Sequence, residues 1–296
     1  MMSSLSPDDT TELDALASFT AVRPRLFGIA YRMLGSAAEA EDILQEVWIK
    51  WQNYDHATVE NTAAFLATMT TRLAINVAQS AHSRRETYIG PWLPEPVDTS
   101  ADPALGAERG EALGFAVLIL LEKLSPTERA AYVLREAFDY PYSSIAEIVQ
   151  LSEPAARKLV SRARQHLTAE RRTPVAAPEQ RRLLSAFLTA AQSGDVSELE
   201  RLFAADVVSY SYGGGNALAA RIPVRGSTRV AKFVAAFASH FWVGVTLRWT
   251  EANGQPAVVL ERDGEPFTVV TTTASADGID QLLWMMNPDK LAHVAA

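Results

Sequence analysis

The chain contains no cysteine in its 296 residues, which excludes disulfide bonds, thiolate metal sites and cysteine nucleophiles. Long apolar runs are also absent, because the longest, Phe115–Leu121, is far shorter than the roughly 20 residues that a membrane span requires. Residues Met1–Asp14 lack the basic segment and apolar core of a secretory signal. These absences predict a cytoplasmic protein.

Positive charge is scarce as well, since 27 Lys and Arg residues face 35 Asp and Glu residues and give a formal net charge of −8. The basic residues are concentrated in two segments. Pro154–Arg172 holds six Lys or Arg residues and one acid, and Arg72–Arg85 holds three arginines and no acid. Neutralised phosphates supply most non-specific DNA affinity, so this distribution predicts weak DNA binding by the chain alone. Another macromolecule is then needed to deliver the chain to DNA.

Metal sites and phosphate-binding loops are not indicated. The histidines are scattered without the spacing of a metal site: His56, His82, His166, His240 and His293. The glycine run Gly213–Gly215 is not followed by a lysine–serine pair or by the start of a helix, as a phosphate-binding loop would be. No metal and no cofactor are therefore expected.

The first third of the chain is predicted to be helical. A periodic apolar pattern over Leu13–Leu34 ends at Gly35, and Ser36 is a suitable N-cap for the next helix. A third helix is predicted over Thr62–His82. Thr87–Pro103 holds four prolines, each of which removes a backbone donor and restricts the residue before it, so this segment is a linker. The apolar stripe of the second helix comprises Ile43, Leu44, Val47, Trp48 and Trp51.

More helices are predicted after the linker, over Glu108–Leu121, Thr127–Phe138, Ser143–Gln150 and Glu153–Leu167. The last two are joined at Leu151–Ser152, which gives the pair the proportions of a helix-turn-helix.

The last helix of this pair has the faces of a DNA-recognition helix. At about 100° of rotation per residue, one apolar face must pack inward. That face comprises Ala156, Leu159, Val160, Ala163 and Leu167. The opposite face comprises Pro154, Lys158, Ser161 and Gln165, with Arg157 and Arg162 on the flanks. Small and basic side chains fit the major groove, where arginine binds guanine edges. A solvated amphipathic helix is the alternative.

The C-terminal part changes character to a separate α+β domain. Its predicted helices are Pro178–Gln192, Val196–Phe203 and Thr228–Phe241. Its predicted strands are Val207–Tyr212, Val243–Glu251, Ala257–Glu261, Phe267–Thr273 and Ile279–Met286. Gly254, Asp263-Gly264 and Asp277-Gly278 supply turns between the strands.

The segment Ala30–Trp48, AYRMLGSAAEAEDILQEVW, strongly resembles region 2 of the extracytoplasmic-function sigma factors. In that family this helix docks on the clamp helices of RNA polymerase. The spacing of Glu39, Asp42 and Glu46 agrees with such docking. It places one acidic stripe on a helix, as a basic partner helix requires. The resemblance implies that Glu39, Asp42, Gln45 and Glu46 bind polymerase. The alternative is a solvated acidic face.

The same resemblance implies that region 2 melts promoter DNA and captures a flipped base of the −10 element. This role falls on Asn53–Asn61 and the following helix, with Arg72, Asn76, Arg84 and Arg85 as the DNA contacts. Gln79 stands where many relatives have an acid, so the sequence departs from the family there. Tyr54 and His56 are candidates for base stacking or for an ordinary turn.

Glu108–Leu167 resembles region 4 of the same family, which contacts the polymerase flap and reads the −35 element. The recognition helix is then Glu153–Gln165. The contacts to the −35 element that the resemblance implies are Glu153, Arg157, Lys158, Ser161, Arg162 and Arg164.

Two further motifs resemble a subgroup of these factors with a fused C-terminal SnoaL-like domain, the sigma factor J-like subgroup. They are Trp92-Leu93-Pro94-Glu95-Pro96 in the linker and Asn287-Pro288-Asp289-Lys290-Leu291 near the end. We expect them to form a regulatory contact between domains. The stretch Tyr212-Gly213-Gly214-Gly215-Asn216 departs from the subgroup, because relatives often have charged residues at both ends of the glycine run.

The predicted fold is multidomain: two all-α domains, the second with a helix-turn-helix, and a C-terminal α+β cone. The boundaries are residues 1–86 for region 2, 87–107 for the linker, 108–172 for region 4 and 173–296 for the SnoaL-like domain. The predicted function is a sigma factor, not an enzyme, whose partners are core RNA polymerase and promoter DNA and whose activity the C-terminal domain modulates.

Two other hypotheses stay open at this point. In one, the cone binds or turns over a small ligand, with Asp206, His240 and Asp280 as the candidates for acid–base work, although fold alone decides nothing and His240 fits a partly buried structural histidine better. In the other, the chain is a stand-alone repressor, which leaves Ala30–Trp48 unexplained.

Overall fold

A computed structural model describes residues 7–85, 93–97, 114–170, 172–214, 220 and 222–291. The chain divides into two compact units. The first unit contains residues 1–86, 107–112 and 121–167, and the second contains residues 87–106, 113–120 and 168–296. Region 2 therefore packs with the helix-turn-helix, whereas the linker packs with the C-terminal domain. Within the described residues, no helix has the length and apolar character to cross a membrane.

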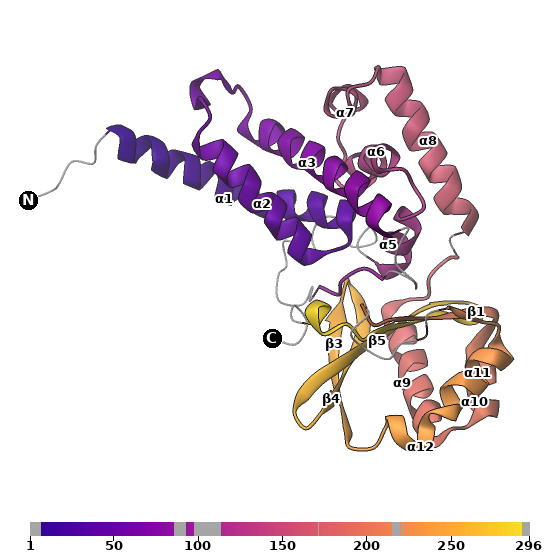
Figure 1. The fold of residues 1–296 in the computed structure, drawn as a ribbon. Coiled ribbons are helices and arrows are strands. Elements are labelled where there is room, and N and C mark those ends of the chain that lie inside the picture. The colour runs from indigo at the N-terminus through magenta and orange to yellow at the C-terminus, as the bar shows by residue number, and fades with distance from the viewer. Residues whose placement is uncertain are drawn as a thin grey trace, which may run out of the picture. The chain divides into compact units, whose positions relative to one another are not determined.

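The first unit begins with three long helices, α1 (Pro7–Leu34), α2 (Ala37–Gln52) and α3 (Thr62–Arg85) (Figure 1). Their predicted positions are confirmed. Gly35 ends α1 with φ 63°, and the Ser36 hydroxyl accepts a hydrogen bond from the Glu39 amide at 3.3 Å, as an N-cap does. The short helix η1 (His56–Thr58) lies between α2 and α3. Fully buried side chains at the centre include Leu26, Ile29, Met33, Leu44 and Leu66.

The same unit contains α6 (Pro126–Glu136), α7 (Tyr142–Val149) and α8 (Glu153–Glu170). A reciprocal capping box between Ser125 and Glu128 begins α6. Gln150 adopts a left-handed conformation after α7, which turns the chain into α8. Helix α6 packs on α1 and α3, and α7 packs on α3.

The faces predicted for the recognition helix α8 are confirmed. The predicted inward residues are all at most 9% exposed: Ala156, Leu159, Val160, Ala163 and Leu167. The predicted outward residues are exposed: Pro154, Arg157, Lys158, Ser161, Arg162 and Gln165. Periodicity alone therefore located the surface that this helix presents.

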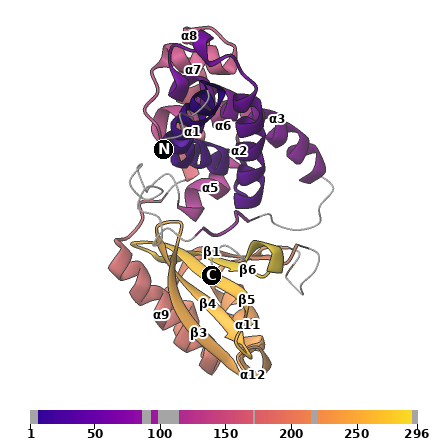
Figure 2. The ribbon, with the colours of Figure 1, turned by 90° about the vertical axis from the view of Figure 1, so that its left-hand side faces the viewer.

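The second unit is built on a six-stranded sheet of order β2-β1-β6-β5-β4-β3, in which β1 runs parallel to β6 and the other neighbours are antiparallel (Figure 2). Its strands are β1 (Phe203–Tyr212), β2 (Val224–Arg225), β3 (Val245–Ala252), β4 (Gln255–Arg262), β5 (Glu265–Ser275) and β6 (Gly278–Met285). Its helices are α5 (Phe115–Leu121, of which residues 115–120 belong to this unit), α9 (Ala177–Ser193), α10 (Val196–Leu202), α11 (Ser227–Ala236), α12 (Ala238–Phe241) and η3 (Pro288–Lys290).

Each face of this sheet has its own apolar core. Helices α9, α10 and α11 cover one face, where Phe187, Leu199 and Val230 pack on Trp284 and its neighbours. The other face, called here the outer face, is covered by parts of the chain that precede the domain in sequence. Leu93 of the linker and Phe115 of α5 pack there with Ala252, Ala257, Val259, Val269, Leu283, Met285 and Leu291.

Three sequence predictions need correction in this domain. The helix predicted over Thr228–Phe241 is interrupted at Phe237, whose backbone (φ −98°, ψ −3°) leaves the regular helix and separates α11 from α12. The helix predicted to include Phe203 ends at Leu202, because Phe203 is already extended. Strand β2 has two residues, too few for an alternating pattern, and was not predicted. Of the helix predicted over Glu108–Leu121, the part before residue 114 lies outside the described residues.

Candidate protein and nucleic-acid interfaces

Helix α2 presents one exposed polar face. Asp42, Gln45 and Glu46 are exposed, and Glu39 is half-buried in the first turn. The next turn adds Ile49, which is 59% exposed, and Lys50 forms an ion pair with Glu46 at 3.4 Å. The structure thus brings the predicted polymerase contacts together, and an exposed apolar side chain lies beside them. Sequence reasoning did not single out Ile49.

The loop after α2 is held by an aromatic cluster. The Trp51 ring is buried and lies 4.1 Å from the His56 ring, and its Nε1 donates to the Ala15 carbonyl at 3.1 Å. His56 Nε2 lies 2.8 Å from the Trp51 carbonyl oxygen. Tyr54 is 42% exposed and packs on Phe65 at 4.6 Å between ring centres. His56 therefore holds the loop, whereas Tyr54 presents a ring to solvent.

Arg72, a predicted contact to the −10 element, binds the end of a helix in this structure. Its Nε donates to the Ile148 carbonyl at 3.1 Å and its Nη2 to the Glu147 carbonyl at 2.9 Å. These carbonyls belong to the last turn of α7, where the helix dipole favours a cation. Asn76 is exposed one turn further along α3. The side chains of Arg84 and Arg85 lie outside the described residues.

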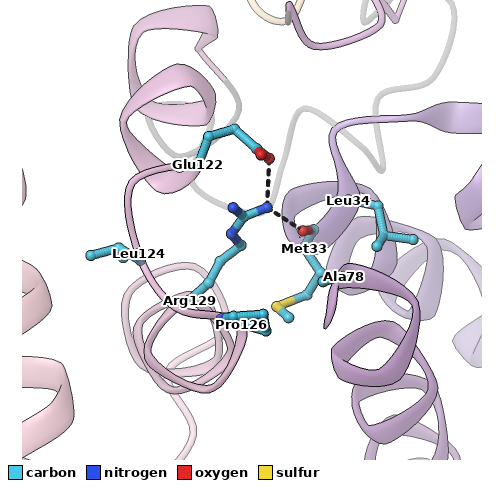
Figure 3. A pocket seen from close by; sticks show the side chains of 7 residues that line it. All are labelled: Met33, Leu34, Ala78, Glu122, Leu124, Pro126 and Arg129. Atoms are coloured by element: carbon cyan, nitrogen blue, oxygen red, sulfur yellow. Dashed lines mark hydrogen bonds and ion pairs between the residues drawn. The ribbon is translucent and has the colours of Figure 1, made fainter. Parts of the chain in front are cut away.

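Two more arginines make the same kind of contact in the first unit. Arg129 of α6 donates to the Met33 carbonyl in the last turn of α1 and to Glu122, both at 2.6 Å (Figure 3). Arg25 of α1 donates to the Phe138 carbonyl, just beyond α6, at 3.0 Å. Region 2 and the helix-turn-helix are thus joined by arginines that bind helix carboxyl ends. Sequence periodicity gives no signal for such contacts.

The exposed basic side chains of α8 form ion pairs with acids, of which Glu128 and Glu136 are half-buried. Arg157 pairs with Glu153 at 2.6 Å, Arg162 with Glu128 at 3.0 Å and Arg164 with Glu136 at 2.7 Å. The hydrogen bond that Arg164 donates to the Glu136 carboxylate raises the pKa of Arg164. Lys158 and Ser161 are exposed on the same helix. Exposed pairs of this kind are worth about 0–1 kcal/mol, so a DNA phosphate competes with them easily.

The linker and the C-terminal motif meet on the outer face, in a contact called here the linker dock. It consists of Leu93–Val97 with Lys290, Leu291 and Tyr212. Lys290 Nζ donates to the Leu93 carbonyl at 2.9 Å and lies 4.5 Å from the centre of the Tyr212 ring. Leu93 and Leu291 are both buried, as are the residues between Leu93 and Val97. Trp92 and the side chain of Asp289 lie outside the described residues, and Pro288 is exposed.

Gly214 packs against the same motif. Gly214 has φ +62°, and a Cβ added there would lie 2.5 Å from the side-chain nitrogen of Asn287, which is buried. The Met286 amide donates to the Tyr212 carbonyl at 2.8 Å beside it. Gly214 therefore has both a conformational and a steric reason to be glycine. Gly215 and Asn216 lie outside the described residues.

Replacing Gly214 by alanine is expected to destabilise the second unit by about 2 kcal/mol, from left-handed strain and the clash with Asn287. Gly244 is the matched control, because it has φ +69° but nothing within 4 Å of an added Cβ. Gly244→Ala is expected to cost about 1 kcal/mol, from strain alone. Urea unfolding of both variants measures the difference, and equal losses would contradict the packing role of Gly214.

The acid–base candidates of the cone do not form a catalytic group. Arg172 binds Asp206 at 2.6 Å and Asp280 at 2.5 Å. Burial raises the pKa of Asp280, against the hydrogen bonds from Arg172 and Ser275, which lower it. The hydrogen bond that Arg172 donates to the Asp280 carboxylate raises the pKa of Arg172. His240 is exposed on α12 with its ring edge-on to Phe237, so the interpretation of a partly buried histidine is wrong.

Known families match both helical regions of the chain. The model for sigma-70 region 2 matches residues 19–85, and the model for sigma-70 region 4 matches residues 115–167. The second match begins with α5, the helix whose first part packs on the outer face of the C-terminal sheet.

Similar proteins extend over nearly the whole chain. The ECF RNA polymerase sigma factor SigJ of Mycobacterium tuberculosis is 36% identical over 291 residues, which cover 93% of this chain and 92% of that protein. The probable ECF RNA polymerase sigma factor SigI of the same organism is 28% identical, covering 95% and 96%. The crystal structure of M. tuberculosis SigJ matches with a TM-score of 0.75 and 31% identity, covering 94% of this chain and 98% of that one.

Proposed function

The chain belongs to the extracytoplasmic-function RNA polymerase sigma factors, and we propose that its C-terminal domain regulates it by holding the linker and α5. As a sigma factor, the protein directs RNA polymerase in transcription initiation and is not an enzyme. It combines regions 2 and 4 with a C-terminal α+β sheet domain. Both family matches end before that domain, so its role is inferred from the contacts that it makes.

The exposed face of α2 binds the clamp helices of core polymerase in this proposal. The support is its shape and charge: Asp42, Gln45 and Glu46 form one exposed stripe with Ile49 at its end. Such a stripe complements a basic helix, and an exposed apolar side chain in its path adds area that can be buried. Region 4 binds the polymerase flap. Because this work takes place on polymerase and chromosomal DNA, the protein acts in the cytoplasm.

Promoter DNA is read by two surfaces of the first unit. The −10 element binds the loop at Tyr54 and the face of α3 with Arg72 and Asn76. The −35 element binds the exposed face of α8, with Lys158 and Ser161 at its centre. Arg72 has two partners in this scheme. Its guanidinium binds the last carbonyls of α7 in this structure, and it binds DNA in the promoter complex. Its side chain must leave α7 before it reaches a phosphate, so DNA binding at Arg72 competes with the contact between α3 and α7.

The observation that carries the regulatory proposal is the position of α5. This helix opens the region 4 match, yet Phe115 and Ile119 pack on the outer face of the C-terminal sheet beside Leu93. The first helix of the region 4 match therefore packs, over residues 115–120, within the unit that contains the C-terminal domain. While the linker dock is closed, α5 stays on the sheet, and the domain restrains the factor. A bias of about 1.4 kcal/mol between closed and open states changes their ratio tenfold.

Transcription with purified core polymerase tests this restraint. Lys290→Ala removes the hydrogen bond to the Leu93 carbonyl, which as a charged hydrogen bond is worth about 1.5–3 kcal/mol. We expect promoter-specific transcription per sigma factor to rise about tenfold at subsaturating factor, the change that 1.4 kcal/mol produces. Lys232→Ala is the matched control, because Lys232 is exposed on α11, away from the linker dock.

A chain that ends at Met286 extends the test by removing the whole Asn287–Leu291 motif. Its output is expected to rise at least as far as that of Lys290→Ala. Equal output from Lys290→Ala, Lys232→Ala and the unmodified chain would refute regulation through the dock. A fall in output with Lys290→Ala would assign the dock an activating role and contradict the restraint.

A further inference from the structure

The β3–β4 turn contacts the linker at the end opposite Lys290. The Asn253 amide donates to the Val97 carbonyl at 2.9 Å, and the Asn253 side-chain oxygen accepts from the Val97 amide at 3.0 Å. Asn253 has no exposed surface. One asparagine therefore satisfies both backbone groups of Val97. Neither motif that the sequence singled out contains Asn253 or Val97.

Turn geometry alone does not explain a buried asparagine at this position. Asn253 and Gly254 have φ 56° and 69°, and the next hairpin has the same pattern at Asp263 and Gly264, with φ 54° and 83°. Asp263, however, is exposed, whereas Asn253 is buried. Asn, Asp and Gly all tolerate the left-handed conformation that such a turn needs. What distinguishes Asn253 is the linker segment that lies against it.

The linker segment between the two contacts is stiff. Leu93 precedes Pro94 and Glu95 precedes Pro96, so both are restricted to extended conformations and both prolines have a fixed φ. Such a segment loses little conformational entropy when it docks. Because Lys290 binds its first residue and Asn253 binds its last, the segment is anchored at both ends.

We propose that Asn253 is a positioning residue that anchors the carboxyl end of the linker segment and, with Lys290, fixes where the linker lies on the outer face. This inference deepens the proposed regulation and rests on it for its biological meaning. The contact uses only backbone groups of Val97, so it selects an extended linker backbone at that position and not a particular side chain. Opening the dock then requires the release of both anchors.

Amide hydrogen exchange of the full-length chain, resolved by residue, tests the anchor directly. Asn253→Gly keeps the turn conformation but removes the acceptor of the Val97 amide. We expect exchange of the Val97 amide to accelerate at least about tenfold, the change that results from losing a hydrogen bond worth about 1.4 kcal/mol. The Gln255 amide, on the strand that leaves the same turn, is expected to keep its rate. Asp263→Gly is the matched control, because Asp263 and Gly264 form an equivalent turn in which the first residue is exposed.

The outcomes separate this inference from the proposed regulation. Unchanged exchange at Val97 in Asn253→Gly overturns the anchor. Equal acceleration at Val97 and Gln255 also overturns it, because the effect would then be a loosened hairpin. Acceleration at Val97 alone, absent from Asp263→Gly, supports it. Transcription measured on the same two variants reports on regulation only: if Val97 is released and output does not change, the anchor stands and the regulatory proposal fails.

Discussion

Replacing Asp42 and Glu46 together by lysine is expected to weaken binding to core RNA polymerase by about 100-fold or more. Both side chains are exposed on one face of α2, so the substitution does not disturb the buried face with Ile43, Leu44 and Val47. A reversed charge against a basic partner loses an attraction and adds a repulsion. Like charges juxtaposed at an interface cost several kcal/mol, and about 2.7 kcal/mol already corresponds to 100-fold.

The matched control for this charge reversal is the pair Asp263→Lys and Glu265→Lys. It changes the net charge by the same amount on two exposed residues of the β4–β5 hairpin. Titration of labelled core polymerase at two salt concentrations measures both variants. The loss caused by reversal at Asp42 and Glu46 should shrink at high salt, since ions screen exposed charges. Equal affinities for both double variants would show that α2 is not the polymerase contact.

The sequence predicted the surfaces of single helices well because helical periodicity is local information. The buried face of α8 followed from rotation about its axis. The exposed positions of Asp42 and Glu46 on α2 followed from their spacing, whereas Glu39 is half-buried. The hairpin turn at Asp263-Gly264 followed from the need for positive φ. Each of these features depends on residues a few positions apart.

Contacts between residues that are distant in the chain leave no periodic pattern in the sequence. Arg72 was predicted as a DNA contact from its place in region 2, but its carbonyl partners at Glu147 and Ile148 lie 75 and 76 residues away. Any arginine near a helix carboxyl end can make this contact, so composition does not reveal which one does. The dock is an intermediate case. Its two motifs were noted from resemblance, whereas Asn253 resembles an ordinary turn asparagine in the sequence.

Arg129→Met, which breaks the pair of Arg129 and Glu122, is expected to lower the stability of the first unit more than any other single substitution there. The Arg129 side chain is 6% exposed and Glu122 is 23% exposed, so Arg129→Met removes the ion pair with Arg129 from a largely desolvated carboxylate. It also leaves the Met33 carbonyl at the end of α1 without its donor. Removing one member of a buried pair costs about 3–5 kcal/mol, and the partial exposure of Glu122 places the expected loss at about 3 kcal/mol.

A double-mutant cycle separates the ion pair from the contact with α1. Arg129→Met with Glu122→Leu removes both charges, and replacing a buried pair by apolar side chains is often close to neutral, so at least about half of the lost stability should return. Arg23→Met is the control, because it breaks an exposed pair with Glu41 in the same unit and is expected to cost at most about 1 kcal/mol. The free energy of unfolding in urea is measured through the hydrogen exchange of amides in α6. This measurement reports on the first unit alone. If the double variant is no more stable than Arg129→Met, the carbonyl of Met33 and not Glu122 is the partner that makes Arg129 indispensable.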